Sequence, residues 1–77
     1  MSPFGQRLRN LRNRQNVTQK DLAKKFKISE SAIGMYERGE REPSFELVRS
    51  LADFFDVSTD YLLGRTDDPS PNNSSKV

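Results

Sequence analysis

Residues 18–39 contain two short helix patterns with almost no chain between them, and this feature constrains the fold more than any other. Thr18 is a helix-capping residue with Asp21 three positions later, a weak form of the capping box. Ser29 caps the second helix only a few residues after the first one stops, and Gly39 is placed to end it. So short a connection forces a sharp turn between the two helices.

Three further helices are expected around this pair. Ser2 and Pro3 are typical of a helix start, and apolar residues follow at helical spacing until the pattern stops near Asn16. A second apolar stripe predicts a helix over residues 45–55, and Ser58 caps a last short helical turn. Because no strand-like alternation occurs, the sequence predicts an all-α fold.

The chain divides by composition at residue 64. A chain of 77 residues can form one small domain with a modest core, which we expect to span residues 1–64. Residues 65–77 read "RTDDPSPNNSSKV" and offer almost nothing to bury. This segment is predicted to be a disordered tail or the start of an interdomain linker.

Charge and composition point to a nucleic-acid partner and away from catalysis. Residues 1–28 carry eight basic residues and one acidic residue, a charge of +7, whereas residues 29–77 carry five basic and ten acidic ones, a charge of −5. A basic lobe suits a polyanion, although small helical domains often carry solvated basic faces too. With no Cys and no His, the sequence predicts no metal site, no cofactor and no enzyme. Neither a membrane span nor a signal peptide is apparent, so a cytoplasmic protein is expected.

Apolar residues within residues 19–38 fall where a helix-turn-helix needs them. The expected packing positions are Leu22, Ala23, Phe26, Ile28, Ile33 and Tyr36. Ala23 has the small side chain that lets the two helices approach closely. The positions between them are mostly polar, which makes a chance pattern a poor explanation.

Residues 4–64 together resemble the DNA-binding domain of the phage repressor and Cro type, the Xre family. The resemblance rests on "LRNLR" in the first helix, "TQKDLA" and "ISESAIGMYERG" in the central pair, "REP" in the loop and the final "VSTDYLLG". It implies a compact five-helix, lambda-repressor-like domain. It also implies that the third helix lies in the major groove, while the second helix meets the sugar-phosphate backbone with its N-terminus.

The outward face of the third helix is the predicted base-reading face. If Ile33 and Tyr36 point inward, the candidate base-contacting residues are Glu30, Ser31, Gly34 and Met35. Glu30 can instead serve only to favour the helix N-terminus, and Gly34 can simply be exposed. None of these side chains offers the bidentate contact of a Gln, Asn or Arg, so the bases read are not evident.

The resemblance implies phosphate contacts and one ion pair, and Arg38, on the outward face near the end of the third helix, is also expected to reach phosphate. The predicted phosphate-contacting residues are Gln19, Ser29, Arg38, Arg41 and Ser44. Arg12 and Glu37 are expected to pair and to tie the third helix to the first.

Two other positions depart from, or extend, the family pattern. Lys27 stands in the turn where the motif usually has glycine, because the backbone there tends to adopt a positive φ. Tyr61 is a possible dimer-interface residue, and core packing is an equally good reading of it.

These observations favour a sequence-specific regulator of transcription, most readily a repressor that binds an inverted-repeat DNA operator as a homodimer. No small-molecule ligand is evident. Two alternatives stay open at this point. One is the antitoxin of a toxin-antitoxin pair with the same fold, and the other is a helical interaction adaptor that does not bind DNA.

Overall fold

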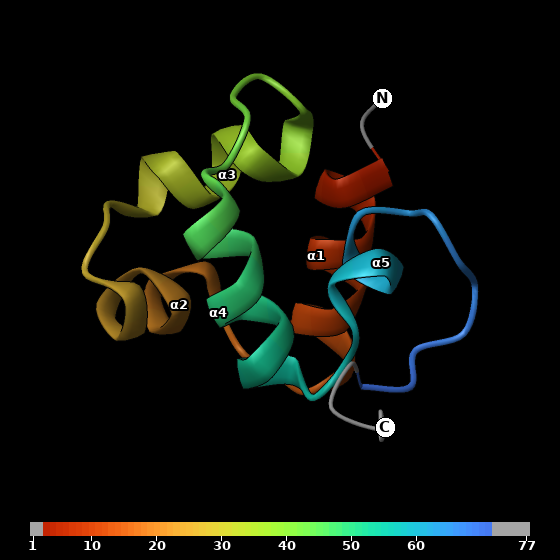
Figure 1. The fold of residues 1–77 in the computed structure, drawn as a ribbon. Helices are drawn as coiled ribbons and strands as arrows, with labels where there is room; N and C mark the ends of the chain where they lie inside the picture. Colours follow the sequence, from red (N-terminus) through yellow and green to blue (C-terminus); the bar gives the residue numbers. More distant parts are fainter. Residues whose placement is uncertain (1–2, 72–77) are drawn as a thin grey trace. The chain divides into compact units, whose positions relative to one another are not determined.

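The computed structural model describes residues 3–71, and within that range the chain forms five α-helices and no strand. They are α1 (Pro3–Arg14), α2 (Gln19–Phe26), α3 (Glu30–Arg38), α4 (Phe45–Phe55) and α5 (Thr59–Leu62), shown in Figure 1. The all-α prediction is therefore confirmed. The chain divides into two units, residues 1–42 with α1 to α3 and residues 43–77 with α4 and α5.

Each helix from α2 to α5 begins at a hydroxyl that the sequence indicates as a cap. The side-chain oxygen of each cap accepts a hydrogen bond from the backbone N–H three residues later, at 2.9–3.1 Å. These caps are Thr18, Ser29, Ser44 and Ser58. Such a bond stabilises a helix by about 1 kcal/mol, which matters in a domain of this size. The cap expected for α1, Ser2, lies outside the described residues.

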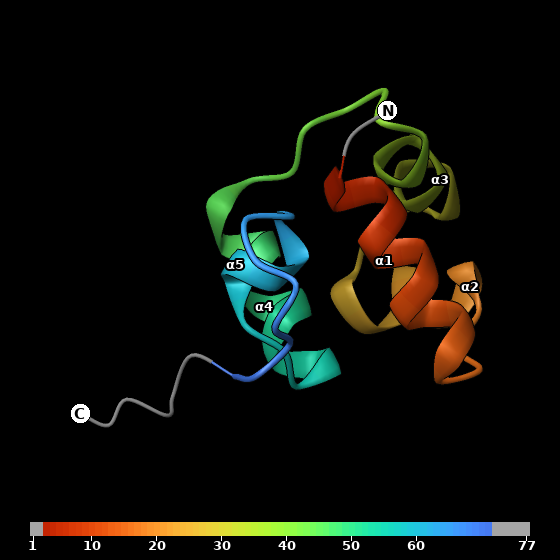
Figure 2. The same ribbon diagram turned by 90° about the vertical axis from the view of Figure 1, so that its right-hand side faces the viewer.

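The first unit is built around α3, which packs against both α1 and α2 (Figure 2). Phe4 and Tyr36 meet edge to face, with ring centroids 6.2 Å apart. Phe26 and Ile28, expected to pack, are half-buried. The buried apolar residues of this unit are Phe4, Leu8, Leu11, Leu22, Ala23, Ala32, Ile33 and Tyr36.

The close approach of α1 to α3 depends on Gly5. A Cβ atom at this position would come closer than 3.0 Å to the backbone carbonyl oxygens of Tyr36 and Glu37. Backbone atoms cannot move aside as the end of a flexible side chain can. Only glycine therefore fits where α1 crosses the last turn of α3.

The turn between α2 and α3 has the left-handed conformation that the sequence predicts. Lys27 has φ 58° and ψ 42°, and the following N–H, from Ile28, donates to the Ala23 carbonyl oxygen at 3.0 Å. Asn16 and Asp56 have the same positive φ of 58° at the ends of α1 and α4. A lysine in this conformation is strained relative to glycine.

The second unit places the apolar stripe of α4 inside and joins it to α5 through a short turn. Its buried apolar residues are Val48, Leu51, Ala52, Phe55, Val57 and Leu62. Residues 65–71 form no helix, and the Ser58 N–H donates to the Pro69 carbonyl oxygen at 3.2 Å. The domain boundary at residue 64 and the disorder of residues 65–77 remain predictions. Residues 72–77 of that segment lie outside the described range. No described helix is long and apolar enough to cross a membrane.

Candidate nucleic-acid interface

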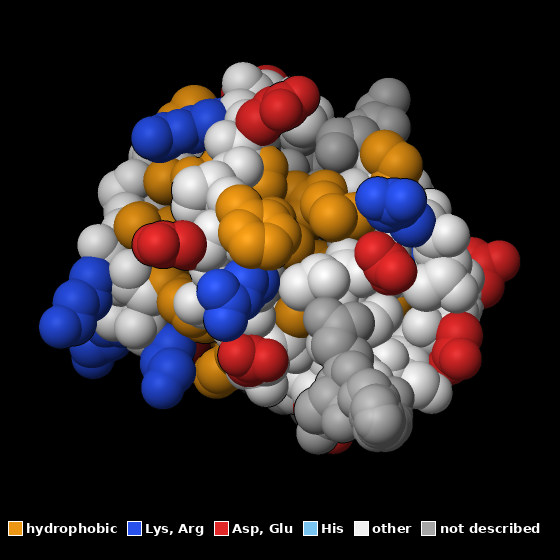
Figure 3. Space-filling view, in the orientation of Figure 1, with side chains coloured by type: hydrophobic (Ala, Val, Ile, Leu, Met, Phe, Trp, Pro, Cys, Tyr) orange, Lys and Arg blue, Asp and Glu red, His pale blue; other side chains and the backbone are white. Residues whose placement is uncertain are grey.

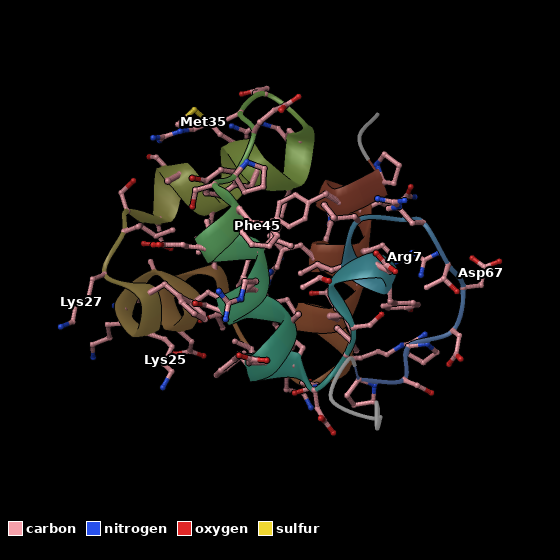
Figure 4. All side chains as sticks on the ribbon, in the orientation of Figure 1. Arg7, Lys25, Lys27, Met35, Phe45 and Asp67 are labelled. Carbon is pink, nitrogen blue, oxygen red and sulfur yellow. The ribbon has the colours of Figure 1, made fainter. Side chains whose placement is uncertain are left out.

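The face of α3 turned away from α1 and α2 is polar and largely uncovered. Glu30 and Ser31 are exposed and Met35 is half-buried. Figure 4 shows Met35 pointing outward from α3. A shallow hollow runs along this face, lined by Gln19, Glu30, Ser31, Gly34, Met35, Arg38 and Glu40. All four candidate base-reading residues therefore line one surface, and Gln19 lies at its edge.

Gly34 is buried, although it belongs to the outward face, because the Arg38 side chain folds back over it. A Cβ atom at Gly34 would lie 3.0 Å from Nη1 of Arg38. That contact is tighter than an ordinary one, but the far end of a flexible side chain can shift. The glycine thus gives the guanidinium room to lie against the helix.

Arg38 is held in this position by Glu40 through a two-point contact. Nε of Arg38 donates to one carboxylate oxygen of Glu40 at 3.0 Å, and Nη2 donates to the other at 3.2 Å. The side chains are 58% and 55% exposed. Their hydrogen bonding, with the attraction between the charges, lowers the pKa of Glu40 and raises the pKa of Arg38.

Gly39 explains how Glu40 reaches Arg38. Gly39 ends α3 with φ 76°, and its N–H donates to the Tyr36 carbonyl oxygen at 3.2 Å. The next N–H, from Glu40, donates to the Met35 carbonyl oxygen at 2.9 Å. This left-handed cap turns the chain back along the helix end, so Glu40 returns beside the last turn. Glu40 was not among the predicted site residues, although an acidic residue directly after a helix-capping glycine is a signal for such a contact.

A second, buried cluster fixes α3 on α1. The carboxylate of Glu37 accepts from Nε and Nη2 of Arg12 at 2.6 and 3.2 Å and from Nε2 of Gln19 at 3.1 Å. Nη1 of Arg12 also donates to the Val17 carbonyl oxygen at 3.2 Å. The side chains of Arg12 and Glu37 are only 13% and 5% exposed. The pair expected from the sequence is therefore present, and Gln19 links it to the start of α2.

The N-terminus of α2 carries a complete capping box. The Asp21 N–H donates to the Thr18 hydroxyl at 3.0 Å, and the Thr18 N–H donates to the Asp21 carboxylate at 3.1 Å. Hydrogen bonds with the backbone and side chain of Thr18 lower the pKa of Asp21. The box orders the first turn of α2, whose N–H groups point along the helix axis.

The remaining predicted site residues are placed as follows. Ser29 caps α3, and the guanidinium of Arg41 lies over the Tyr36 ring, 5.7 Å from its centroid. Ser44 caps α4 in the second unit. Tyr61 is half-buried on α5, also in the second unit.

Basic side chains gather over α2 in Figure 3. Lys24, Lys25 and Lys27 are exposed, and Lys25 and Lys27 point away from the helix in Figure 4. Across residues 3–71, the structure has no group of three or more acidic residues arranged to hold a metal ion. The feature that distinguishes this unit is thus an uncovered polar helix face next to a basic helix.

Comparisons with known proteins agree with this geometry. A family model described as "Helix-turn-helix" matches residues 8–62. The chain is 44% identical over 68 residues to the uncharacterized HTH-type transcriptional regulator YobD of Bacillus subtilis, covering 88% of this chain and 61% of YobD. It is 38% identical over 74 residues to the HTH-type transcriptional regulator ImmR of the same organism, covering 96% of this chain and 58% of ImmR. The chain therefore spans about three-fifths of the length of these two relatives.

A solved structure is also similar. The crystal structure of the restriction-modification controller protein C.AhdI from Aeromonas hydrophila matches with a TM-score of 0.71 at 36% sequence identity. The match covers 79% of this chain and 92% of that one. It confirms the expected helix-turn-helix fold.

Proposed function

The chain belongs to the helix-turn-helix family, and we propose that it is a DNA-binding regulator of transcription. In this proposal the outward face of α3 contacts the bases. Membership of this family also confirms the prediction that the chain is not an enzyme. The observation that carries the proposal is the polar face of α3, which α1 and α2 leave uncovered. An α-helix fits the width of the major groove of B-DNA.

The proposed base readers are Glu30, Ser31 and Met35, whereas Gly34, predicted beside them, is buried under the Arg38 side chain. Glu30 can accept a hydrogen bond from cytosine N4, and Ser31 can donate to or accept from a base edge. Met35 offers an apolar contact for a thymine methyl group. Their common hollow supports the proposal, because residues that read one groove must lie on one surface.

Phosphate contacts are proposed as well, and Gln19, one of them, lines the same hollow. Gln19 is at the start of α2, where free N–H groups and the helix dipole favour an anion. Its amide nitrogen carries two hydrogens, and donating one to Glu37 leaves the other for a phosphate oxygen. Ser29, Arg41 and Ser44 are proposed as further phosphate contacts.

The buried pair of Arg12 and Glu37 has a supporting role in this proposal. It joins the last turn of α3 to α1, while Gln19 joins the same carboxylate to α2. The cluster thereby fixes the distance between a phosphate bound near Gln19 and a base contacted by α3. Such rigidity is what a helix needs to select one base sequence over another.

We further propose that the protein acts as a repressor and binds an inverted-repeat operator as a homodimer. Two copies related by a two-fold axis would place their α3 helices in major grooves about one helical turn apart. Tyr61 on α5 is the proposed dimer-interface residue. Occupancy of the operator would itself block transcription, so the proposal involves no cofactor and no small-molecule ligand.

The test is selection of bound duplexes from a random pool, followed by a salt titration on the most enriched one. We expect an enriched palindrome whose affinity falls steeply as salt rises, because phosphate contacts release condensed counterions. Gln19→Ala should weaken binding to all enriched duplexes by similar factors and leave their ranking unchanged. The absence of enrichment, or an affinity indifferent to salt, would refute the proposed function.

A further inference from the structure

We propose that Arg38 reads a guanine in the major groove and that Glu40 is the residue that positions it for this contact. This inference rests on the proposed function and replaces the expectation that Arg38 contacts phosphate. It also supplies what the candidate base readers lack, because none of Glu30, Ser31 and Met35 can make the bidentate contact of an arginine.

Glu40 occupies one edge of the Arg38 guanidinium. An arginine has five N–H donors in a rigid planar fork. Glu40 takes the edge formed by Nε and Nη2, at 3.0 and 3.2 Å. The end of the fork, formed by Nη1 and the second hydrogen of Nη2, is a separate pair of parallel donors. A pair of this kind matches the O6 and N7 acceptors of guanine, the commonest specific contact in protein–DNA complexes.

The end of the Arg38 fork lies over Gly34. Nη1 sits above Gly34, so close that a Cβ atom there would be only 3.0 Å from it. Arg38, Gly34 and Met35 line the same hollow on the outward face of α3. The donor pair is therefore on the base-reading surface, and the glycine makes room for it there.

The charge of Glu40 makes Arg38 a poor partner for phosphate. Glu40 brings a full negative charge into contact with the guanidinium, because a glutamate carboxyl is ionised at neutral pH, and the contact itself lowers its pKa. A phosphate approaching Arg38 would meet a paired, electrically neutral group and a carboxylate that repels it. A guanine edge is uncharged, and it needs directed donors rather than net charge. The pairing thus favours a base contact over a phosphate contact.

Glu40 also restricts the orientation of the Arg38 side chain. A two-point contact restricts the rotation of an otherwise flexible side chain, and Glu40 is itself tied to the helix end by its N–H bond to Met35. The left-handed Gly39 sets that return of the chain. Glu40 is accordingly a positioning residue, and Arg38 is the residue that would touch the base.

The experiment repeats the random-duplex selection with Arg38→Ala, Glu40→Gln and the control Glu42→Gln. Glu42 is an exposed acid two residues further along, so its replacement makes the same change in net charge. The selected duplexes give a matrix of base preferences at each position of the site. We expect the wild-type matrix to contain a position at which guanine is preferred by about 5- to 150-fold. Arg38→Ala should abolish that preference and leave the salt slope of binding unchanged. Glu40→Gln should reduce the preference at the same position, while Glu42→Gln should preserve it.

Other outcomes would overturn the inference and are separable from failure of the proposed function. Arg38→Ala could keep the base preferences of the wild type and lose about one unit of its salt slope. That result would make Arg38 a phosphate contact. A preserved guanine preference in Glu40→Gln would remove its positioning role. If the wild-type protein enriches no duplex, the DNA-reading function fails as well. Equal melting midpoints of the variants establish that a changed matrix does not come from unfolding.

Discussion

Replacing Glu37 by glutamine tests the buried cluster that holds α3 in place. The Glu37 carboxylate accepts three hydrogen bonds, two from Arg12 and one from Gln19. Glutamine has the same shape but only one acceptor oxygen, and its NH₂ group would face the donors of the guanidinium. The substitution therefore leaves a largely buried positive charge without its counter-charge.

The size of the effect follows from burial. Removing one partner of a buried ion pair costs about 3–5 kcal/mol. The 13% exposure of the Arg12 side chain and its bond to the Val17 carbonyl place the loss near the lower end, about 3 kcal/mol. In a domain of 60–100 residues each kcal/mol lowers the melting temperature by about 4–8 °C. The expected decrease is thus about 12–24 °C.

Thermal unfolding followed by circular dichroism measures this loss, with Glu40→Gln as the matched control. Glu40 makes the same kind of two-point contact, but its pair with Arg38 lies in solvent, so the control should melt close to the wild type. A double variant, Arg12→Met with Glu37→Leu, should recover most of the lost stability because no charge is then left buried. A Glu37→Gln variant that melts with the control would refute the reasoning.

Three further predictions concern the backbone and the caps. Lys27→Gly should stabilise the domain by about 1 kcal/mol or less, because relief of the left-handed strain outweighs the greater freedom of the unfolded chain; a lower melting temperature would contradict this. Gly5→Ala should destabilise by about 3 kcal/mol or more in urea unfolding, since the added methyl overlaps the Tyr36 carbonyl, and an unchanged midpoint would show that α1 can shift. Asp21→Asn should have a lower melting temperature than the wild type at pH values above 3.8, the ordinary aspartate pKa. This difference in melting temperature should vanish as the pH falls through the pKa of Asp21, which its hydrogen bonds with Thr18 lower. A difference that persists in acid would exclude the cap as its cause.

Local signals in the sequence were sufficient for the helices. The capping hydroxyls at Thr18, Ser29, Ser44 and Ser58 each act within three residues, so their hydrogen bonds can be read directly from the sequence. The positive φ of Lys27 was indicated by the family resemblance, because the motif usually has glycine at this position. The pairing of Arg12 with Glu37 spans distant residues, and only the family resemblance indicated it.

Close approaches between distant segments could not be predicted. Gly5 appears in the sequence as a poor residue inside a helix, and its reason lies in the carbonyl oxygens of α3. Gly34 was expected to be exposed or close to DNA, but its surface is covered by Arg38. That cover depends on the turn at Gly39, which brings Glu40 back to the helix end. Periodicity reports which face a residue occupies, whereas these contacts depend on how one segment meets another.

A comparison of the base preferences of Ser31→Ala and Met35→Ala with those of the wild-type protein shows directly whether the outward face of α3 selects the bases. Both side chains lie on the outward face of α3, and neither carries a charge. If this face reads the major groove, each variant should lose or change its preference at its own base positions, with the salt slope and the remaining positions unchanged. An enriched site whose matrix is the same in both variants and in the wild type would show that another surface of the protein selects the bases.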